Sequence, residues 1–324
     1  MKSLLCAGVP LLLASTLSAS DIHLTVESAG QSSISVNPGA NIVYKVRGEL
    51  SDQLNEGLAG FTFDLTFDGG PIAPAAAPGS SPMNGFAPPL GLSNPAGYGG
   101  TAVGGDLIQV GGMQNTIGNF LAIPPTGSVI TGVAWPGASK SLVTGVVKAP
   151  MFPGNYTLSL TNPHANVIRM GESGVPFWAC DEAGIGTVTH LAIEVKEVFS
   201  SDVTELSIAG GDTQTMTLTA GAANAGRAYF VLGSVTGTTP GLPLGPVHLP
   251  LNFDFYMNLT LSSPNAFPLT DSLGLLNGSG GGTTLFTMPT GLSPGLVGVE
   301  ISHAYLLVAP EDFASNPVTI EIVL

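Results

Sequence analysis

The chain has 324 residues and carries 8 Lys and Arg against 22 Asp and Glu, a formal net charge of −14 at pH 7. Its few cations are scattered singly along the sequence, so nucleic acid and anionic membrane surfaces are not expected as partners. The 44 Gly and 26 Pro, together with 44% hydrophobic residues in a repeated pattern, exclude charge-driven disorder and favour short strands joined by many turns.

The first twenty residues have the features of a secretory signal peptide. Lys2 precedes an apolar stretch over 4–17, which is too short to span a bilayer, and the small residues Ser18-Ala19-Ser20 follow it. We therefore expect residues 1–20 to be removed and the remaining chain to be secreted and soluble. Cys180 is then the single cysteine left, so no intrachain disulfide is expected.

Beyond this leader the sequence alternates apolar and polar residues with period two, while helical periodicity is nearly absent. The clearest case is 61–68, in which four large apolar side chains alternate with four polar ones, as a strand with one buried face requires. Shorter examples, separated by Gly/Pro turns, are 22–26, 42–46, 156–160, 191–195, 216–218, 229–231, 259–261, 306–308 and 318–322. The pattern predicts an all-β protein of two antiparallel β-sandwiches in tandem, of jelly-roll or Ig-like type.

The segment 36–69 resembles the start of cohesin modules. A Val-Asn-Pro-Gly turn at 36–39 leads into the strand at 42–46, and Gly57 to Asp68 reads GLAGFTFDLTFD. Carbohydrate-binding β-sandwiches of the wider superfamily start in a similar way. The resemblance implies a sandwich that acts through its surface, as a cohesin does when it presents one sheet face to a calcium-loaded dockerin.

A Gly/Pro/Asn-rich segment interrupts the first module over about 69–127 and has no counterpart in cohesins. Connections this long are uncommon in compact domains and are often functional, although this one is also suited to covering a sheet edge. Asp106–Val110 is predicted to form one short strand within it. Tyr98 in this segment and Trp135 beside a Pro-Gly turn are candidate ligand-stacking residues; the alternative is that such aromatics fill the core.

Asp64 and Asp68 point to the same face of the strand at 61–68. They are candidates for a calcium-binding or polar contact face, and the alternative is a solvated strand surface that ends in a turn Asp. No EF-hand or Gly-rich calcium repeat accompanies them in the sequence. We therefore predict no cofactor, and no motif supports the calcium hypothesis.

Catalytic motifs are weak throughout the sequence. Glu172 and Asp181 flank Trp178 and are candidate acids for a polysaccharide hydrolase, which needs two carboxyls about 5–10 Å apart. The Gly-x-Ser-x-Gly match at 291–295 lacks the backbone N–H that an oxyanion hole needs, because Pro294 follows the serine. The five histidines lack zinc-site spacing.

We place the boundary between the modules at Ser200-Ser201-Asp202, giving a first module over 21–199 and a second over 203–324. The second resembles C-terminal modules of secreted bacterial proteins, a resemblance that carries no activity. The sequence as a whole predicts a secreted, non-catalytic binding or structural protein that engages an extracellular protein module or a polysaccharide. A polysaccharide hydrolase and an adhesive or structural protein of the cell envelope remain as alternatives.

Overall fold

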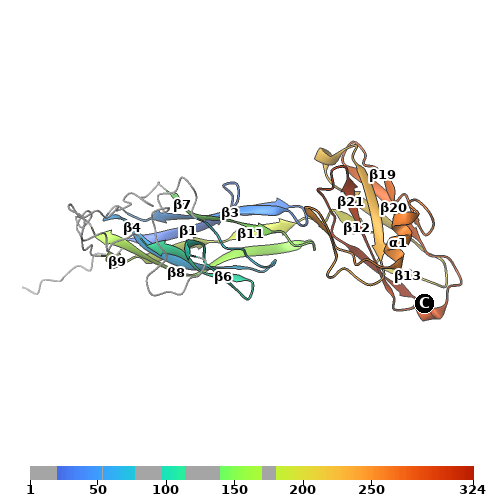
Figure 1. Ribbon diagram of the computed structural model, residues 1–324, viewed down its shortest axis with the longest axis horizontal. Coiled ribbons are helices and arrows are strands. Elements are labelled where there is room, and N and C mark those ends of the chain that lie inside the picture. The colour runs from blue at the N-terminus through green and yellow to red at the C-terminus, as the bar shows by residue number, and fades with distance from the viewer. Residues whose placement is uncertain (1–19, 53, 77–96, 114–138, 170–179) are drawn as a thin grey trace, which may run out of the picture.

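The computed structural model describes residues 20–52, 54–76, 97–113, 139–169 and 180–324 (Figure 1). These residues form two β-sandwich modules that follow one another along the chain, which confirms the predicted all-β fold of two tandem domains. In the part of the chain that is described, no helix is long and apolar enough to cross a membrane.

Within its described residues, the first module has eleven strands and one short 3-10 helix, η2. Their bounds are β1 Asp21–Glu27, β2 Ser33–Val36, β3 Asn41–Leu50, β4 Asn55–Phe67, η2 Gly97–Gly99, β5 Thr101–Val103, β6 Asp106–Met113, β7 Lys140–Lys148, β8 Gly154–Arg169, β9 Cys180–Glu182, β10 Gly184–Thr189 and β11 Leu191–Val195. One sheet has the order β10-β1-β3-β7, and the other has the order β2-β11-β8-β4-β6-β5, with β9 beside β8.

Period-two alternation places the core of this module between its two sheets. In β3 the side chains of Ile42, Tyr44 and Val46 are at most 2% exposed, while their neighbours in the sequence face outward. In β4 the large apolar residues of 61–67 likewise point into the core, as the sequence predicts. Each fully buried side chain of this size contributes about 2 kcal/mol to folding.

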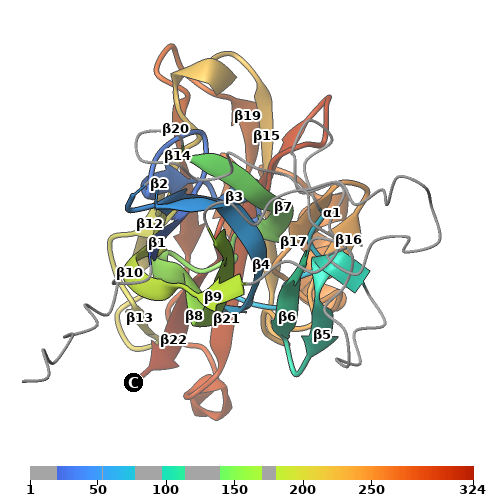
Figure 2. The ribbon, with the colours of Figure 1, turned by 90° about the vertical axis from the view of Figure 1, so that its left-hand side faces the viewer.

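The described parts of the long Gly/Pro-rich segment belong to the sandwich. Strand β6 contains the predicted strand Asp106–Val110 and pairs with β4, and β5 pairs with β6 to form a hairpin (Figure 2). Ile72 and Ala75 are buried in the core, and Ala76 forms a bridge with Thr144 of β7. The hairpin therefore extends the larger sheet; residues 77–96 and 114–127 of the segment lie outside the described residues.

The second module consists of eleven strands, the helix α1 and two 3-10 turns. Their bounds are β12 Phe199–Ser201, β13 Glu205–Ser207, β14 Thr213–Thr219, η3 Ala222–Asn224, β15 Ala228–Ser234, β16 Leu242–Leu244, β17 Val247–Leu249, α1 Phe255–Ser262, β18 Leu269–Thr270, β19 Leu273–Leu275, β20 Gly281–Thr287, η4 Pro294–Leu296, β21 Glu300–Val308 and β22 Val318–Val323. The sheet β12-β14-β20-β18 packs on the sheet β13-β22-β21-β15-β19, and β16 and β17 form a separate hairpin.

The second module begins earlier than the sequence analysis places it. Val198 and Phe199 are buried in its core, and β12 pairs with β14. On the other side, the Lys196 N–H still donates to the carbonyl of Val36 in the first module. The change of module thus falls at Lys196 and Glu197. The boundary expected at Ser200-Ser201-Asp202 lies at the end of β12, which is an edge strand of the second module.

One expected strand is a helix. Leu259 and Leu261 were predicted to lie on a strand, and they lie on α1 instead. Asp254 precedes this helix and its Oδ1 accepts the backbone N–H of Met257 at 2.8 Å, which is the geometry of a helix N-cap. The N-cap at Asp254 favours a helix here, and the alternation of Leu259 and Leu261 was too short a pattern to indicate a strand.

Candidate functional site

Asp64, a candidate ligand residue, lies near the C-terminal end of β4 and binds both neighbouring strands. Its Oδ1 accepts the backbone N–H of Gln109 on β6 at 2.8 Å, and its Oδ2 accepts the side-chain amide of Asn162 on β8 at 2.7 Å. Gln109 and Asn162 have positive φ angles of 55° and 49°, and the register of both strand pairs shifts beside Asp64. The carboxylate therefore stabilises two β-bulges at once.

Asp68, the second candidate carboxylate, ties the end of β4 to β8. Its Oδ1 accepts the backbone N–H of Thr157 at 2.7 Å. Among the described residues, no group of three or more His, Cys, Asp or Glu side chains is arranged to hold a metal ion. Both carboxylates thus have a structural function in the sheet, and a ligand-binding function for them stays a prediction.

Tyr98, the third candidate, packs onto the core of the first module. Its hydroxyl donates to the carbonyl of Leu142 at 2.9 Å, and its ring meets Phe61 edge-on with 5.7 Å between the ring centres. Burial raises the pKa of this phenol well above its ordinary value. Trp135, Trp178 and Glu172 lie outside the described residues, so the tryptophan site and the carboxyl pair of a hydrolase stay predictions.

The second module contains an apolar groove that the sequence analysis missed. It lies between α1, the end of β20 and the loop that contains η4, and it has a volume of about 530 Å³. The residues that line it are Val235, Phe255, Tyr256, Leu259, Phe267, Pro268, Phe286, Thr287, Met288, Pro289, Leu292, Leu296, Val299, Ile301 and Ile322. All but Thr287 and the hydroxyl of Tyr256 present apolar atoms.

The floor of the groove is the core of the sandwich itself. Phe286, Ile301 and Ile322 are at most 7% exposed and belong to the second core, which opens to solvent here. The rim is exposed: the side chain of Phe255 is 75% accessible and that of Phe267 is 60% accessible. A continuous exposed apolar surface of this kind is a candidate interaction site, whereas single exposed apolar side chains are common on protein surfaces.

A network around Asp254 fixes the helical wall of the groove. Its Oδ2 accepts the backbone N–H groups of Val235 and Thr236 at 2.7 and 3.0 Å and the hydroxyl of Ser234 at 2.8 Å, in addition to the N-cap bond to Met257. Partial burial alone would raise the pKa of Asp254, but these hydrogen bonds outweigh it and hold the pKa below its ordinary value. The position of α1 therefore depends on an ionised carboxylate.

Below the groove, a buried aromatic pair keeps the floor uncharged. The hydroxyl of Tyr256 lies 3.0 Å from Nε2 of His303, which is completely buried beside Phe286. Burial lowers the pKa of His303 to about 3 and raises the pKa of Tyr256 above its ordinary value. Both side chains are neutral over the whole physiological range, so they contribute packing and no charge.

The chemistry of the groove is that of a binding surface. Its lining residues include no carboxylate, imidazole or thiol, and the Thr287 and Tyr256 hydroxyls are its polar side-chain groups. It also has few polar groups with which to orient a hydroxyl-rich ligand. It can hold apolar side chains.

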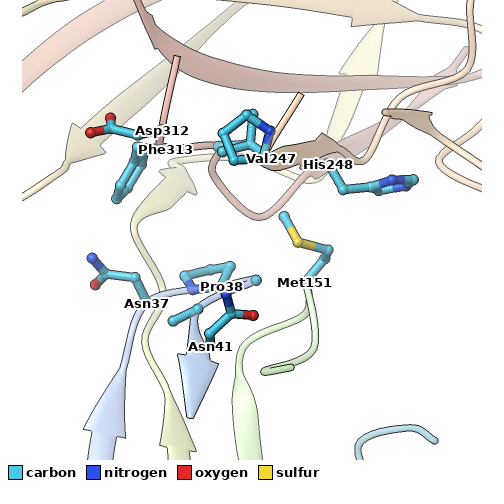
Figure 3. A pocket seen from close by; sticks show the side chains of 12 residues that line it. Asn37, Pro38, Asn41, Met151, Val247, His248, Asp312 and Phe313 are labelled. Carbon is cyan, nitrogen blue, oxygen red and sulfur yellow. The ribbon is translucent and has the colours of Figure 1, made fainter. Parts of the chain in front are cut away.

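A second cavity of about 240 Å³ lies where the two modules meet (Figure 3). The first module contributes the turn at 37–41 and Met151, and the second contributes Val247, His248 and the segment 312–314. Met151 points toward Val247 and His248 in Figure 3 and packs against the apolar cluster on the outer side of the second module. It therefore provides an apolar contact between the modules.

Comparisons with known proteins give only distant structural similarity. No family model and no curated protein matches the chain. A non-cellulosomal cohesin from the hyperthermophilic archaeon Archaeoglobus fulgidus is 10% identical, with 55% of this chain and 92% of that one covered and a TM-score of 0.32. The sixth cohesin of scaffoldin B from Acetivibrio cellulolyticus, solved in complex with a Cel5 dockerin mutant, is 16% identical, with 54% and 99% covered and a TM-score of 0.32.

A third structure, the major pilin subunit BcpA of Bacillus cereus, is 8% identical, with 94% of this chain and 66% of that one covered and a TM-score of 0.29. Similarity at this level assigns no function to this chain.

Proposed function

We propose that this chain is an extracellular, non-catalytic binding protein whose second module holds an apolar segment of a partner protein in the groove beside α1. The observation that carries the proposal is the position of the exposed rings of Phe255 and Phe267 over a floor of core side chains. Apolar grooves of this type bind peptide segments through a few side chains that insert as anchors. The leader-like residues 1–20 support export of the chain.

The lining favours a polypeptide over a polysaccharide as the occupant. Each sugar hydroxyl that leaves water needs a new hydrogen-bond partner, and an unsatisfied one costs about 1–3 kcal/mol. Among the lining residues, only the Thr287 hydroxyl and the Tyr256 hydroxyl could serve, and the latter already contacts His303. Apolar side chains of a partner need no such groups.

Charge indicates what should flank the apolar anchors of the partner. Residues 198–324 carry one cation, Arg227, which pairs with Asp312. The acidic residues of the same stretch are Asp202, Glu205, Asp212, Asp254, Asp271, Glu300, Glu311, Asp312 and Glu321. A partner segment with Lys or Arg beside its apolar anchors is therefore attracted, and its association rate should fall as the salt concentration rises.

Selection from a displayed random peptide library tests this function. The bait is the chain lacking residues 1–19, and the counter-selection bait is the double variant Phe255→Ser/Leu259→Ser. We expect enriched peptides with large apolar residues next to Lys or Arg, and we expect the double variant to lose them. A control variant, Leu275→Ser, removes an equally exposed apolar side chain (71% accessible) outside the groove and should retain them.

Two outcomes would contradict the proposal. One is a peptide set that binds the double variant as well as the parent chain. The other is a peptide set that is lost in Leu275→Ser, because the groove would then not be the site of binding.

A further inference from the structure

We propose that the cavity between the two modules binds one neutral sugar unit, either free or at the end of a chain, which contacts both modules at once. This site is separate from the groove and does not depend on the function proposed for it. The cavity volume of about 240 Å³ is roughly eight times the space of one water molecule. It accommodates a single sugar ring but not a folded segment of a partner.

Free amide groups supply the polar contacts. The side chains of Asn37 and Asn41 line the cavity, and neither makes a hydrogen bond to another residue within the described part of the chain. Each amide offers two donors and one acceptor, which matches hydroxyls that both donate and accept. From the second module, the half-exposed carboxylate of Asp312 adds a further acceptor.

Apolar side chains supply the surface for the ring itself. In Figure 3 the ring of Phe313 points from the second module toward Asn37 and Pro38 of the first. Met151 and Val247 lie on the other side of the same cavity. A sugar ring has hydroxyls on its edge and C–H groups on its faces, so polar groups at the rim and apolar groups inside fit it. Cavities at domain interfaces are frequent ligand sites.

The backbone turn that carries these amides is held in place before a ligand arrives. The turn that carries Asn37 is closed by a hydrogen bond from the N–H of Ala40 to the carbonyl of Asn37, and the Gly39 N–H donates to the carbonyl of Pro150. Gly39 has a φ of 68°, which a residue with a side chain rarely adopts. Such pre-organisation lowers the entropy cost of binding.

The charge at the site favours a neutral ligand over a cation. Arg227 donates to the carboxylate of Asp312 and to the carbonyl of Pro310, so the negative charge of Asp312 is already balanced. In the second module, Nε2 of His248 lies 2.8 Å from the carbonyl of Pro240 and must donate to it.

Binding at this place should restrict the motion of the modules. They are joined covalently through Lys196 and Glu197, and Met151 makes an apolar contact between them. Two modules of one chain move relative to one another by default unless the interface between them is large and apolar. A ligand that contacts both sides selects the orientation in which the cavity has its present shape.

The experiment uses the chain that lacks residues 1–19. Glucose, galactose, mannose, xylose and N-acetylglucosamine, together with the β-1,4-linked oligomers of glucose and xylose, are titrated by calorimetry. Small-angle X-ray scattering is recorded with and without each sugar. We expect at least one sugar to bind and to narrow the distribution of interatomic distances. The comparison of monomer with oligomer separates a free sugar from the end of a chain.

Two variants locate the site. Asn37→Ala/Asn41→Ala removes both amides and should weaken binding at least about tenfold. Val247→Phe fills the cavity while keeping an apolar residue, and it should abolish binding. The control Asn258→Ala removes an exposed amide on α1 and should leave binding unchanged. Unfolding midpoints of all variants are measured so that loss of folding is recognised.

The proposal is overturned if no sugar of the panel binds the parent chain, or if the double variant and Val247→Phe both retain its affinity. Binding that leaves the scattering unchanged would also overturn it, since a ligand in this cavity has to hold both modules. Peptide binding in the groove is expected to persist in all of these variants.

Discussion

The side-chain amide of Asn316 and the backbone of Phe199 exchange two hydrogen bonds. Oδ1 of Asn316 accepts the N–H of Phe199 at 3.1 Å, and Nδ2 donates to the carbonyl of Phe199 at 2.7 Å. The same Oδ1 accepts the N–H of Val198 at 2.9 Å. One buried side chain thus makes the backbone hydrogen bonds that a neighbouring strand would otherwise make, at the point where the chain enters the second module.

Replacing Asn316 with Ala should therefore destabilise the second module. Three buried backbone groups would lose their partner, and each unsatisfied group costs about 1–3 kcal/mol. We expect a loss of at least about 3 kcal/mol in the unfolding free energy, measured in urea with a signal specific to this module. The exposed control Asn258→Ala should stay within about 0.5 kcal/mol of the parent chain. Equal stability of the two variants would contradict this role for Asn316.

The stability of the second module should depend on the ionisation of Asp254. Because its pKa is lower in the folded chain than in the unfolded chain, its contribution is complete above the unfolded pKa of about 4 and is lost as the pH falls through the folded pKa. Asp254→Asn keeps one acceptor for the N-cap but replaces Oδ2, which accepts from Ser234, Val235 and Thr236, with a donor, so it should lose at least about 1 kcal/mol at pH 7. The difference between the parent chain and this variant in unfolding free energy should shrink as the pH falls from 7 to 3. A difference that stays constant over this range would show that the charge is not involved.

Replacing Asp64 should destabilise the first module, because its carboxylate has a structural function in the sheet. Asp64→Ala removes the acceptor that the two bulged strands share, and we expect the first module to lose about 2 kcal/mol, in line with a charged hydrogen bond. Asp106→Ala, at the exposed start of β6, is the matched control and should have little effect. Calcium should not raise the unfolding midpoint of the parent chain. A calcium-dependent increase that Asp64→Ala abolishes would restore the ligand hypothesis.

The rim and the floor of the groove should respond differently to substitution. Phe255→Ser removes an exposed ring, so its effect on stability should lie within about 0.5 kcal/mol, while binding of an apolar fluorescent dye falls. Phe286→Ala removes a ring that is 3% exposed and should cost about 3–5 kcal/mol. Thermal unfolding and dye titration measure both. Dye binding that is unchanged in Phe255→Ser would show that the groove is not its site.

The sequence predicts that the leader ends after Ser20, whereas the contacts of Ser20 predict that processing leaves this residue on the exported chain. Ser20 is buried, its hydroxyl donates to Asp52 at 2.6 Å, and it accepts the side-chain amide of Asn55 at 2.6 Å. The first of these bonds is the main cause that lowers the pKa of Asp52. Amino-terminal sequencing of the exported protein should therefore find Ser20 or an earlier residue first. Asp21 as the first residue would contradict it.

Local patterns in the sequence predicted the strands well, because burial on alternate positions is a local property. The residues of 61–68 alternate strictly, and 61–67 form the second half of β4. The short strand at 106–110 was also predicted, inside a segment rich in Gly and Pro. The same rule failed at 259–261, where two alternations were too few and the capping Asp254 decided for a helix. A long alternating pattern therefore predicts a strand reliably, and a pattern of only two apolar residues does not.

The candidate sites could not be predicted in the same way, since they depend on contacts between distant segments. Asp64 has its function because Gln109 and Asn162, 45 and 98 residues away, adopt positive φ angles. The groove combines residues from α1, β20, β21, β22 and the intervening loops. The exposure of Phe255 follows from the start of a helix that the sequence analysis did not recognise.

Ile301, the second residue of β21, lies at the groove, and the strand ends at Val308, four residues before Asp312 at the module junction. At about 3.3 Å per residue, its length from Ile301 to Val308 is about 23 Å. This spacing is enough for simultaneous occupancy: a peptide in one location and a sugar in the other would not collide. The chain would then act as an adaptor that holds a peptide and a sugar at a fixed distance from one another.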